Sequence, residues 1–177
     1  DGIDIQQVIT TSDTNKMVVG ASWRDSKVFN HNSYSEEKGI DNIGLFVNNT
    51  WEFAPTWTLN AGARYDDHSQ SGDDTTFSIG VNKKIDDDSH IYINWAQIYN
   101  APNTDDLFYG YKASQDEDGK WSSGYYGRDD LKAETGETWT IGYNGKLNEK
   151  TDVGINYFES DVDDAIDWFY IKNEEHG

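Results

Sequence analysis

The sequence has no cysteine and only two prolines among its 177 residues. Without cysteine it has no disulfide framework, no thiol nucleophile and no thiolate metal site. No apolar run approaches the roughly 20 residues of a membrane-spanning helix. Residues Asp1 to Asp4 are not the basic and then apolar start of a signal peptide, so no signal peptide is expected.

Basic residues are also scarce, with 14 Lys and Arg against 33 Asp and Glu and a formal net charge of -19. A nucleic-acid surface needs basic side chains to neutralise phosphates, and docking on anionic lipid headgroups needs a polybasic patch. The composition argues against both kinds of surface. The acids gather in expected turns and loops, which indicates a solvated surface; cation binding is the alternative.

Aromatic residues are plentiful, and apolar side chains alternate with small polar ones in short segments. The clearest pair is Trp57 to Tyr65 and Phe77 to Ile85. A strand directs successive side chains to opposite faces, so one face of each segment is apolar and the other is polar. A soluble sheet buries the apolar face, whereas an outer-membrane barrel turns it to lipid and lines its lumen with the polar face.

The alternation and the turn signals predict an all-β fold, an antiparallel up-and-down meander of about seven to eight strands. The expected strands lie near residues 3–11, 17–30, 41–54, 56–66, 75–85, 89–100, 136–147 and 151–171. Short connections alternate with longer loops at 31–40, 67–74 and 101–135, which places the two kinds at opposite ends of the sheet. This asymmetry is typical of a transmembrane β-barrel, and residues 1–177 are interpreted as a single barrel segment.

A soluble β-sandwich that binds carbohydrate through its aromatic residues is the rival interpretation. It predicts a core built from the apolar face, with Leu59, Ala61, Phe77, Ile79, Ile141 and Ile155 buried. The barrel interpretation instead assigns aromatic residues near strand ends to interfacial girdles. These residues are Trp51, Trp57, Tyr65, Tyr92 and Tyr99.

The segment 101–135 is too long for a hairpin loop, and loops of this length are usually functional or disordered. Its aromatic residues among Gly, Ser and acids are typical of a binding loop. The alternative is an ordered lid whose rings pack on one another. The candidate ligand-binding residues are Tyr109, Tyr111, Trp121, Tyr125, Tyr126 and Arg128.

Three segments carry motifs in a recognisable order: Trp57–Asp66 contains Gly-Ala-Arg-Tyr-Asp, Ile91–Pro102 ends in Tyr-Asn-Ala-Pro, and Asp129–Trp139 contains Asp-Asp-Leu-Lys-Ala-Glu-Thr. They resemble the Gly-x-Arg-Tyr-Asp strand, the Phe-Arg-Ala-Pro-like box and the Asn-Pro-Asn-Leu-Lys-Pro-Glu-Thr box of TonB-dependent outer-membrane receptors. Asn100 stands where that family has Arg, and Ala133 stands where it has Pro.

Such receptors close about 22 strands around a plug domain. This chain has too few strands and no recognisable plug or TonB box, so the resemblance implies part of the barrel with the plug absent. It implies location in the bacterial outer membrane, contact with lipid, and contact with TonB only through the missing plug.

The resemblance further implies uptake of a scarce nutrient, with a ferric siderophore as the default and haem or cobalamin as alternatives. None of the four histidines lies in 101–135, where related haem receptors carry a ligand to iron. The acidic loops favour a cationic or neutral ligand over an anionic one.

Enzymatic motifs are absent from the sequence. It contains no Gly-x-Ser-x-Gly, P-loop or His-Glu-x-x-His pattern. The run Asp116 to Gly119 lacks the spacing of an EF-hand loop. The chain is therefore predicted to be no enzyme, with no cofactor and no catalytic or metal-binding residue.

Overall fold

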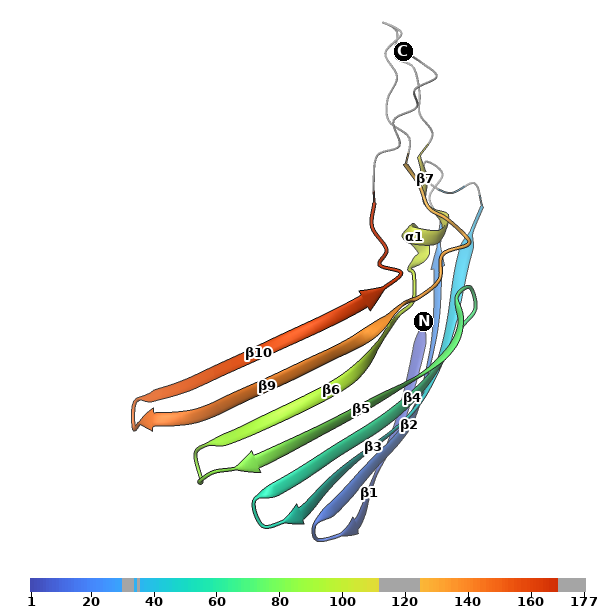
Figure 1. The fold of residues 1–177 in the computed structure, drawn as a ribbon. Coiled ribbons are helices and arrows are strands. Elements are labelled where there is room, and N and C mark those ends of the chain that lie inside the picture. Colours follow the sequence, from blue (N-terminus) through green and yellow to red (C-terminus); the bar gives the residue numbers. More distant parts are fainter. Residues whose placement is uncertain (30–33, 35, 112–124, 169–177) are drawn as a thin grey trace, which may run out of the picture.

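The computed structural model describes residues 1–29, 34, 36–111 and 125–168 (Figure 1). The predicted antiparallel meander is confirmed: eight long strands form one sheet in the order β1-β2-β3-β4-β5-β6-β9-β10. Their bounds are β1 Gly2–Ser12, β2 Asn15–Val28, β3 Lys38–Ala54, β4 Trp57–His68, β5 Gly72–Lys84, β6 His90–Asn100, β9 Glu134–Asn148 and β10 Thr151–Asp163. Between β6 and β9 lie the helix α1 (Thr104–Phe108) and the short pair β7 (Gly110–Tyr111) and β8 (Tyr125–Tyr126).

The sheet has a turn end and a loop end. At the turn end, β1–β2, β3–β4, β5–β6 and β9–β10 are joined by the short connections 13–14, 55–56, 85–89 and 149–150. The loop end carries the connections 29–37 and 101–133 and the residues that follow Asp163. The predicted sorting of short and long connections therefore holds, with one exception.

The exception is the loop predicted at 67–74, which is much shorter. The β4–β5 ladder continues through the pairs Asp67↔Asp73 and His68↔Gly72 and leaves residues 69–71 as the connection. Gly72 makes this possible because its φ of 84° lies in the left-handed region. The last strand is also shorter than predicted, since it ends at Asp163, where the following residue has a φ of 55°.

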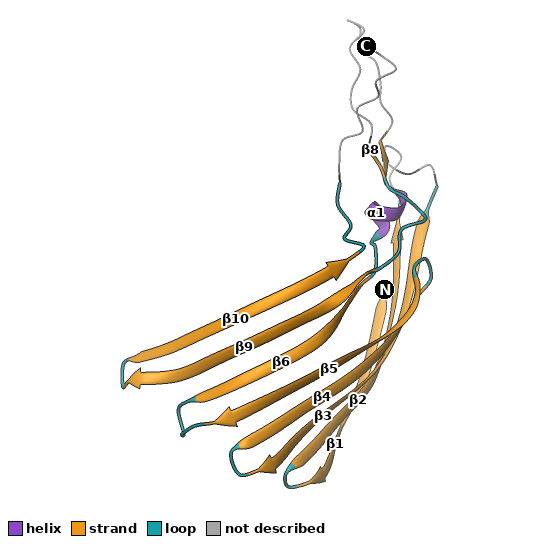
Figure 2. Cartoon of the chain, viewed as in Figure 1, coloured by secondary structure: helices purple, strands orange, loops and turns teal. Residues whose placement is uncertain are grey.

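The two faces of the sheet differ in chemistry, as the alternation predicts. The outer face carries the apolar side chains, and the inner face carries glycines and polar residues. Figure 2 shows the sheet curved into an open trough, with α1 at its loop end. Close packing across the inner face depends on glycine at some positions. A Cβ at Gly44 would overlap the Arg64 guanidinium, and one at Gly142 would overlap the Tyr92 ring.

The apolar outer face is exposed. Phe77, Ile79 and Ile141 are 51%, 49% and 56% accessible, and Ile155 is 68% accessible. No second layer covers these side chains among the residues that the structure describes. The rival prediction of a soluble sandwich with this face as its core is therefore wrong for the described part of the chain.

The aromatic girdle stays a prediction, and the structure shows which of its residues gather at one end of the sheet. At the turn end the Phe53 ring lies 5.8 Å from that of Trp51 and 6.2 Å from that of Trp57, measured between centroids. Lys83 Nζ lies 4.7 Å from the Trp57 centroid. Tyr92 does not belong to this group, because strand parity places it on the inner face opposite Gly142.

The helix α1 was not expected from the sequence. Asn103 caps it by accepting hydrogen bonds from the backbone N–H groups of Asp105 and Asp106, at 2.8 and 3.0 Å. The Asp106 carboxylate in return accepts from the Asn103 N–H, which completes a capping box. No helix in the described ranges is long and apolar enough to cross a membrane.

Candidate functional site

A cavity of about 470 Å³, here called the polar cavity, lies on the inner face at the loop end. Strands β2, β3, β4 and β6 and the segment that leads into α1 supply its lining. Its lining residues are Arg24, Ser26, Ile40, Asn42, Arg64, Asp66, His68 and 99–104.

Arg64 is fixed within the polar cavity by its neighbours. Its Nε and one terminal nitrogen donate to the two carboxylate oxygens of Asp66 at 2.6 and 2.7 Å. The same terminal nitrogen lies 3.3 Å from the Ser22 hydroxyl, and the guanidinium carbon lies 6.0 Å from the Phe46 ring centroid. Asp66 is only 6% accessible. The charge of Arg64 is therefore neutralised in place by a buried carboxylate.

His68 and Asn42 face each other across the β3–β4 ladder at the edge of the cavity. His68 is 5% accessible, and its Nδ1 accepts from the Ser71 N–H at 3.2 Å and contacts the Ser71 hydroxyl at 2.8 Å. This histidine therefore holds the short β4–β5 connection closed. The Asn42 side-chain oxygen is buried, and no donor among the described residues reaches it.

A second group of residues, the loop cluster, joins segments that are distant in the chain: Tyr34, Asp105, Tyr109 and Trp168. The buried Tyr34 hydroxyl donates to the Asp105 carboxylate. The Tyr109 ring meets those of Tyr34 and Trp168 edge to face, each with centroids 6.1 Å apart. Burial, with the hydrogen bond to Asp105, raises the pKa of Tyr34 to about 12.

The loop cluster borders a second cavity of about 430 Å³, the aromatic cavity. Its lining is Asn103, Asp105, Asp106, Tyr109 and Trp168. Asn103 also lines the polar cavity, so the two spaces adjoin. The described part of its lining therefore presents ring faces and two carboxylates, with no basic side chain among these residues.

The predicted ligand-binding residues are spread over this end of the molecule. Tyr109 belongs to the loop cluster. Tyr111 and Tyr125 are opposite each other in the β7–β8 pair, and Tyr126 is 61% accessible. Trp121 lies outside the described residues. Arg128 forms a two-bond ion pair with Asp130 at 2.9 and 2.6 Å, which lowers the pKa of that carboxyl. Their role in binding remains a prediction.

The residues of the polar cavity and three of the four residues of the loop cluster were not among the predicted ligand-binding residues. Arg64, Asp66 and His68 occupy alternate positions of β4, so one strand places all three on the inner face. That signal was present in the sequence. Tyr34 and Trp168 could not have been found in this way, because only the folded loops bring them to Tyr109.

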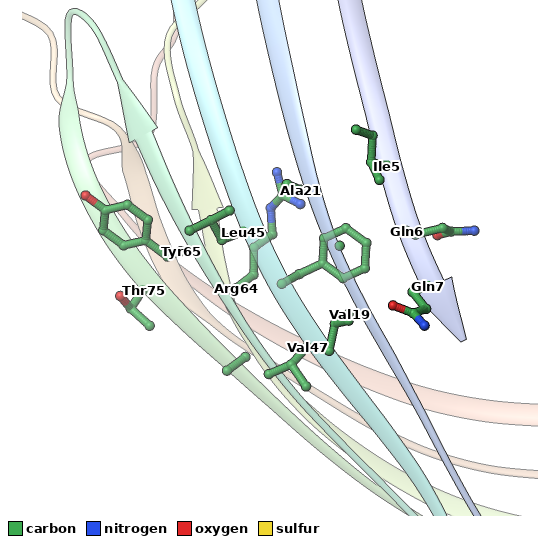
Figure 3. Close-up of a pocket in the computed structure, with 13 residues that line it drawn as sticks. Ile5, Gln6, Gln7, Val19, Ala21, Leu45, Val47, Arg64, Tyr65 and Thr75 are labelled. Carbon is green, nitrogen blue, oxygen red and sulfur yellow. The ribbon is translucent and has the colours of Figure 1, made fainter. Parts of the chain in front are cut away.

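A third hollow lies on the apolar outer face (Figure 3). This groove has a volume of about 600 Å³ and crosses strands β1 to β5. Val19, Leu45, Val47 and Tyr65 line it with their apolar surfaces. Exposed apolar area of this extent marks an interaction or membrane surface in a folded protein.

Comparison with known proteins shows which family has this architecture. The family described as "TonB dependent receptor-like, beta-barrel" matches residues 3–174. The chain therefore belongs to this family of receptor barrels.

Among its relatives, the ferrienterobactin receptor of Escherichia coli K12 is 27% identical over 169 residues, which are 93% of this chain and 21% of that protein. Two solved structures from Pseudomonas aeruginosa share the fold. A mutant of the ferric enterobactin receptor PfeA aligns with a TM-score of 0.73 at 20% identity, over 91% of this chain and 26% of that one. The siderophore receptor PirA aligns with a TM-score of 0.75 at 21% identity, over 91% and 30%.

The chain thus spans about a fifth of the length of the curated relative that it matches. Identities near 20% establish the shared fold of the two structures. The names of these relatives describe their own ligands, and the ligand of this chain has to be argued from its own residues.

Proposed function

We propose that this chain forms part of the wall of an outer-membrane receptor that takes up a ferric siderophore. The observation that carries the proposal is the division of one curved sheet into an exposed apolar outer face and a polar inner face. A barrel wall in a bilayer needs this arrangement, since lipid covers one face and an aqueous lumen meets the other. Membership of the receptor family supports the same function.

The loop end is the ligand-binding end in this proposal. It holds the polar cavity, the aromatic cavity and the predicted residues Tyr109, Tyr126 and Arg128, whereas the turn end has only short connections between the described strands. Binding loops on a rigid sheet are a common arrangement for recognition. The ligand meets aromatic platforms first and polar groups of the inner wall next.

The outer face contacts membrane lipid, and the aromatic group of Trp51, Phe53 and Trp57 lies at one interface. TonB acts on such a receptor through a plug domain, and the residues of this chain contribute wall and loops. The chain binds its ligand and performs no chemistry on it.

The test is binding by the purified chain in detergent micelles. Ferric siderophores of different chemistry are titrated while tryptophan fluorescence is followed, and β-sheet circular dichroism establishes that the chain is folded. We expect saturable quenching by at least one ferric complex and none by its iron-free form. A folded chain that stays monomeric without detergent and binds no ferric complex would contradict the proposal.

A further inference from the structure

His68 is a buried titratable residue to which the proposed function gives no role. It is the last residue of β4, lines the polar cavity and is only 5% accessible. On the outer face of the same strand the apolar side chains end at Tyr65, and the exposed Asp67 follows. His68 therefore lies beyond the apolar band of the wall, at the loop end, where the surrounding solution sets its protonation.

The contacts of the ring require its neutral form. His68 Nδ1 lies 3.2 Å from the backbone nitrogen of Ser71, 3.4 Å from that of Gln70 and 2.8 Å from the Ser71 hydroxyl. A backbone N–H can only donate, so Nδ1 has to accept and the ring proton belongs on Nε2. A protonated imidazolium carries hydrogen on both nitrogens and accepts nothing. Only the neutral ring can therefore hold residues 70 and 71.

The rest of the β4–β5 connection is tied to strands on both sides. The Ser69 N–H donates to the Asp41 carbonyl oxygen at 2.9 Å, and the Asp41 N–H donates to the Ser69 hydroxyl at 3.1 Å. At the other end the Gly72 carbonyl oxygen accepts from the Tyr99 hydroxyl at 3.2 Å, and Tyr99 lines the polar cavity. His68 holds the middle of the connection, between the contacts to β3 and to β6.

A protonated ring has a different partner within reach. Asn42 lies directly opposite His68 in the β3–β4 ladder, and side chains at opposite positions of a ladder are close neighbours on one face. The Asn42 side-chain oxygen is buried, and no donor among the described residues reaches it. An imidazolium that turns away from Ser71 can donate to this oxygen. The ring therefore has two arrangements, and its proton decides between them.

We propose that His68 makes the β4–β5 connection pH-sensitive. When neutral, it holds residues 69–71 closed at the edge of the polar cavity. When protonated, it releases the Ser71 and Gln70 N–H groups and adds a positive charge to the wall of the cavity. This property goes beyond the proposed function and does not depend on which ligand the receptor takes.

The direction of the pH response follows from the surroundings of the ring. Its neighbouring strands carry these charged or titratable groups: Arg24 on β2, Asp41 on β3, Arg64, Asp66 and Asp67 on β4, Asp73 and Asp74 on β5, and Tyr99 on β6. The two arginines are paired with Asp4 and Asp66. Burial lowers the pKa of His68 from its ordinary value of 6.5, and the Asp67 carboxylate opposes this shift. The closed connection is therefore fully stabilised above pH 6.5 and loses this contribution as the pH falls through the lowered pKa.

The experiment is amide hydrogen exchange of the folded chain in detergent micelles, from about pH 8 down to about pH 4.5. Protection factors are compared, because they correct for the intrinsic effect of pH on exchange. We expect protection of the Gln70 and Ser71 amides to fall about tenfold with acid, the effect of losing their hydrogen bonds. The Glu52 N–H, which donates to the Thr14 carbonyl oxygen at 2.8 Å at the turn end, is the internal control and should not change. Constant protection at residues 70 and 71, or an equal fall at Glu52, would overturn the proposal.

Two substitutions separate protonation from a purely structural role. His68→Asn keeps a side-chain acceptor that cannot be protonated in this range, so protection of the Ser71 amide should stay high at every pH. His68→Ala has no acceptor and should show the low protection of the acid form throughout. His90→Asn, at the turn end, is the matched control and should respond to pH as the wild-type chain does. A pH response in His68→Asn equal to that of the wild-type chain would overturn the proposal, even if His68→Ala failed to fold.

Discussion

Single residues on the inner face are arranged so that small side chains leave room for large ones. Gly44 lies beneath the Arg64 guanidinium, and its missing Cβ lets Arg64 lie flat between Asp66 and Ser22. Gly72 acts through its backbone, because its left-handed φ lets β4 and β5 pair up to their last residues. The wall of the polar cavity thus depends on two glycines for two different reasons.

Substitution of Gly72 tests the backbone role. A Cβ there meets no atom within 4 Å, but the φ of 84° is unfavourable for any residue with a side chain. Gly72→Ala is expected to lower the free energy of unfolding by about 1 kcal/mol, measured by urea denaturation in detergent. Gly39→Ala is the control, since a Cβ there finds ordinary contacts at 3.6 Å. Equal effects of the two substitutions would contradict the argument.

The hydroxyl of Tyr34 gives the loop cluster a defined pH dependence. Its pKa is raised to about 12 in the folded chain, from about 10 in an unfolded one. The folded state therefore favours the neutral hydroxyl. The contribution of this contact is fully present below about pH 10 and is lost as the pH rises through 12.

The measurement is a titration of absorbance at 295 nm, which follows ionised tyrosine, for the wild-type chain and for Tyr34→Phe. The difference between the two curves reports Tyr34 alone, and its midpoint should lie near pH 12, well above that of an exposed tyrosine. A difference titration centred near pH 10 would show that Tyr34 is not held by burial and by Asp105.

At the scale of elements, the helix α1 depends on its cap. It has only five residues, so its own hydrogen bonds do not hold it. Asn103→Ala removes the acceptor for two backbone N–H groups and is expected to cost about 1 kcal/mol of local stability. Faster hydrogen exchange at Asp105 and Asp106 would report this loss. Asn103→Asp keeps the acceptor and should retain slow exchange; equally fast exchange in both variants would refute the capping role.

The elements also show what could be predicted from the sequence. The strands were predictable because alternation with period two is strong in segments such as Trp57 to Tyr65. The connection at 67–74 was misjudged because four aspartates near it are typical of a loop, yet Asp66↔Asp74 and Asp67↔Asp73 are ladder pairs. The helix α1 was missed because five residues are too few to show a helical period, although Asn103 and Asp106 carry a capping signal.

The candidate site was less predictable than the fold. Segment 101–135 was identified as a binding loop, and Tyr109 does lie beside a cavity. The contacts of Tyr109 with Tyr34 and Trp168 join two connections and the segment that follows β10. A single sequence contains no pattern for pairing side chains across such segments. The alternation that placed Arg64 and Asp66 on the polar face could have identified them, because charged residues on a barrel's inner wall meet the lumen.

At the scale of the whole molecule, the outer face has to be covered. Apolar side chains from β1 to β10 are exposed on it, and none of the described residues forms a second layer over them. The two edge strands also leave backbone groups free for pairing, which an open sheet in water tolerates poorly. In the proposed function, lipid meets the first need. A charge placed on the outer face should therefore be far more damaging than the same charge on the inner face.

The pair Ile79 and Ser78 makes this comparison at neighbouring positions in the middle of β5. Ile79 is 49% accessible on the outer face, and Ser78 lies on the inner face opposite Gly62 and Ala96. Ile79→Arg is expected to cost about 2–4 kcal/mol on folding into lipid vesicles, the range for a basic residue at the bilayer midplane. Ser78→Arg turns its charge to the polar trough and should fold nearly as well as the wild-type chain. The folded fraction can be measured by gel mobility without heating. If both variants fold equally, the outer face does not meet lipid. Residues 78 and 79 are neighbours in sequence and differ in the face they occupy, so the same charge should have different effects at the two positions only if hydrocarbon surrounds the outer one.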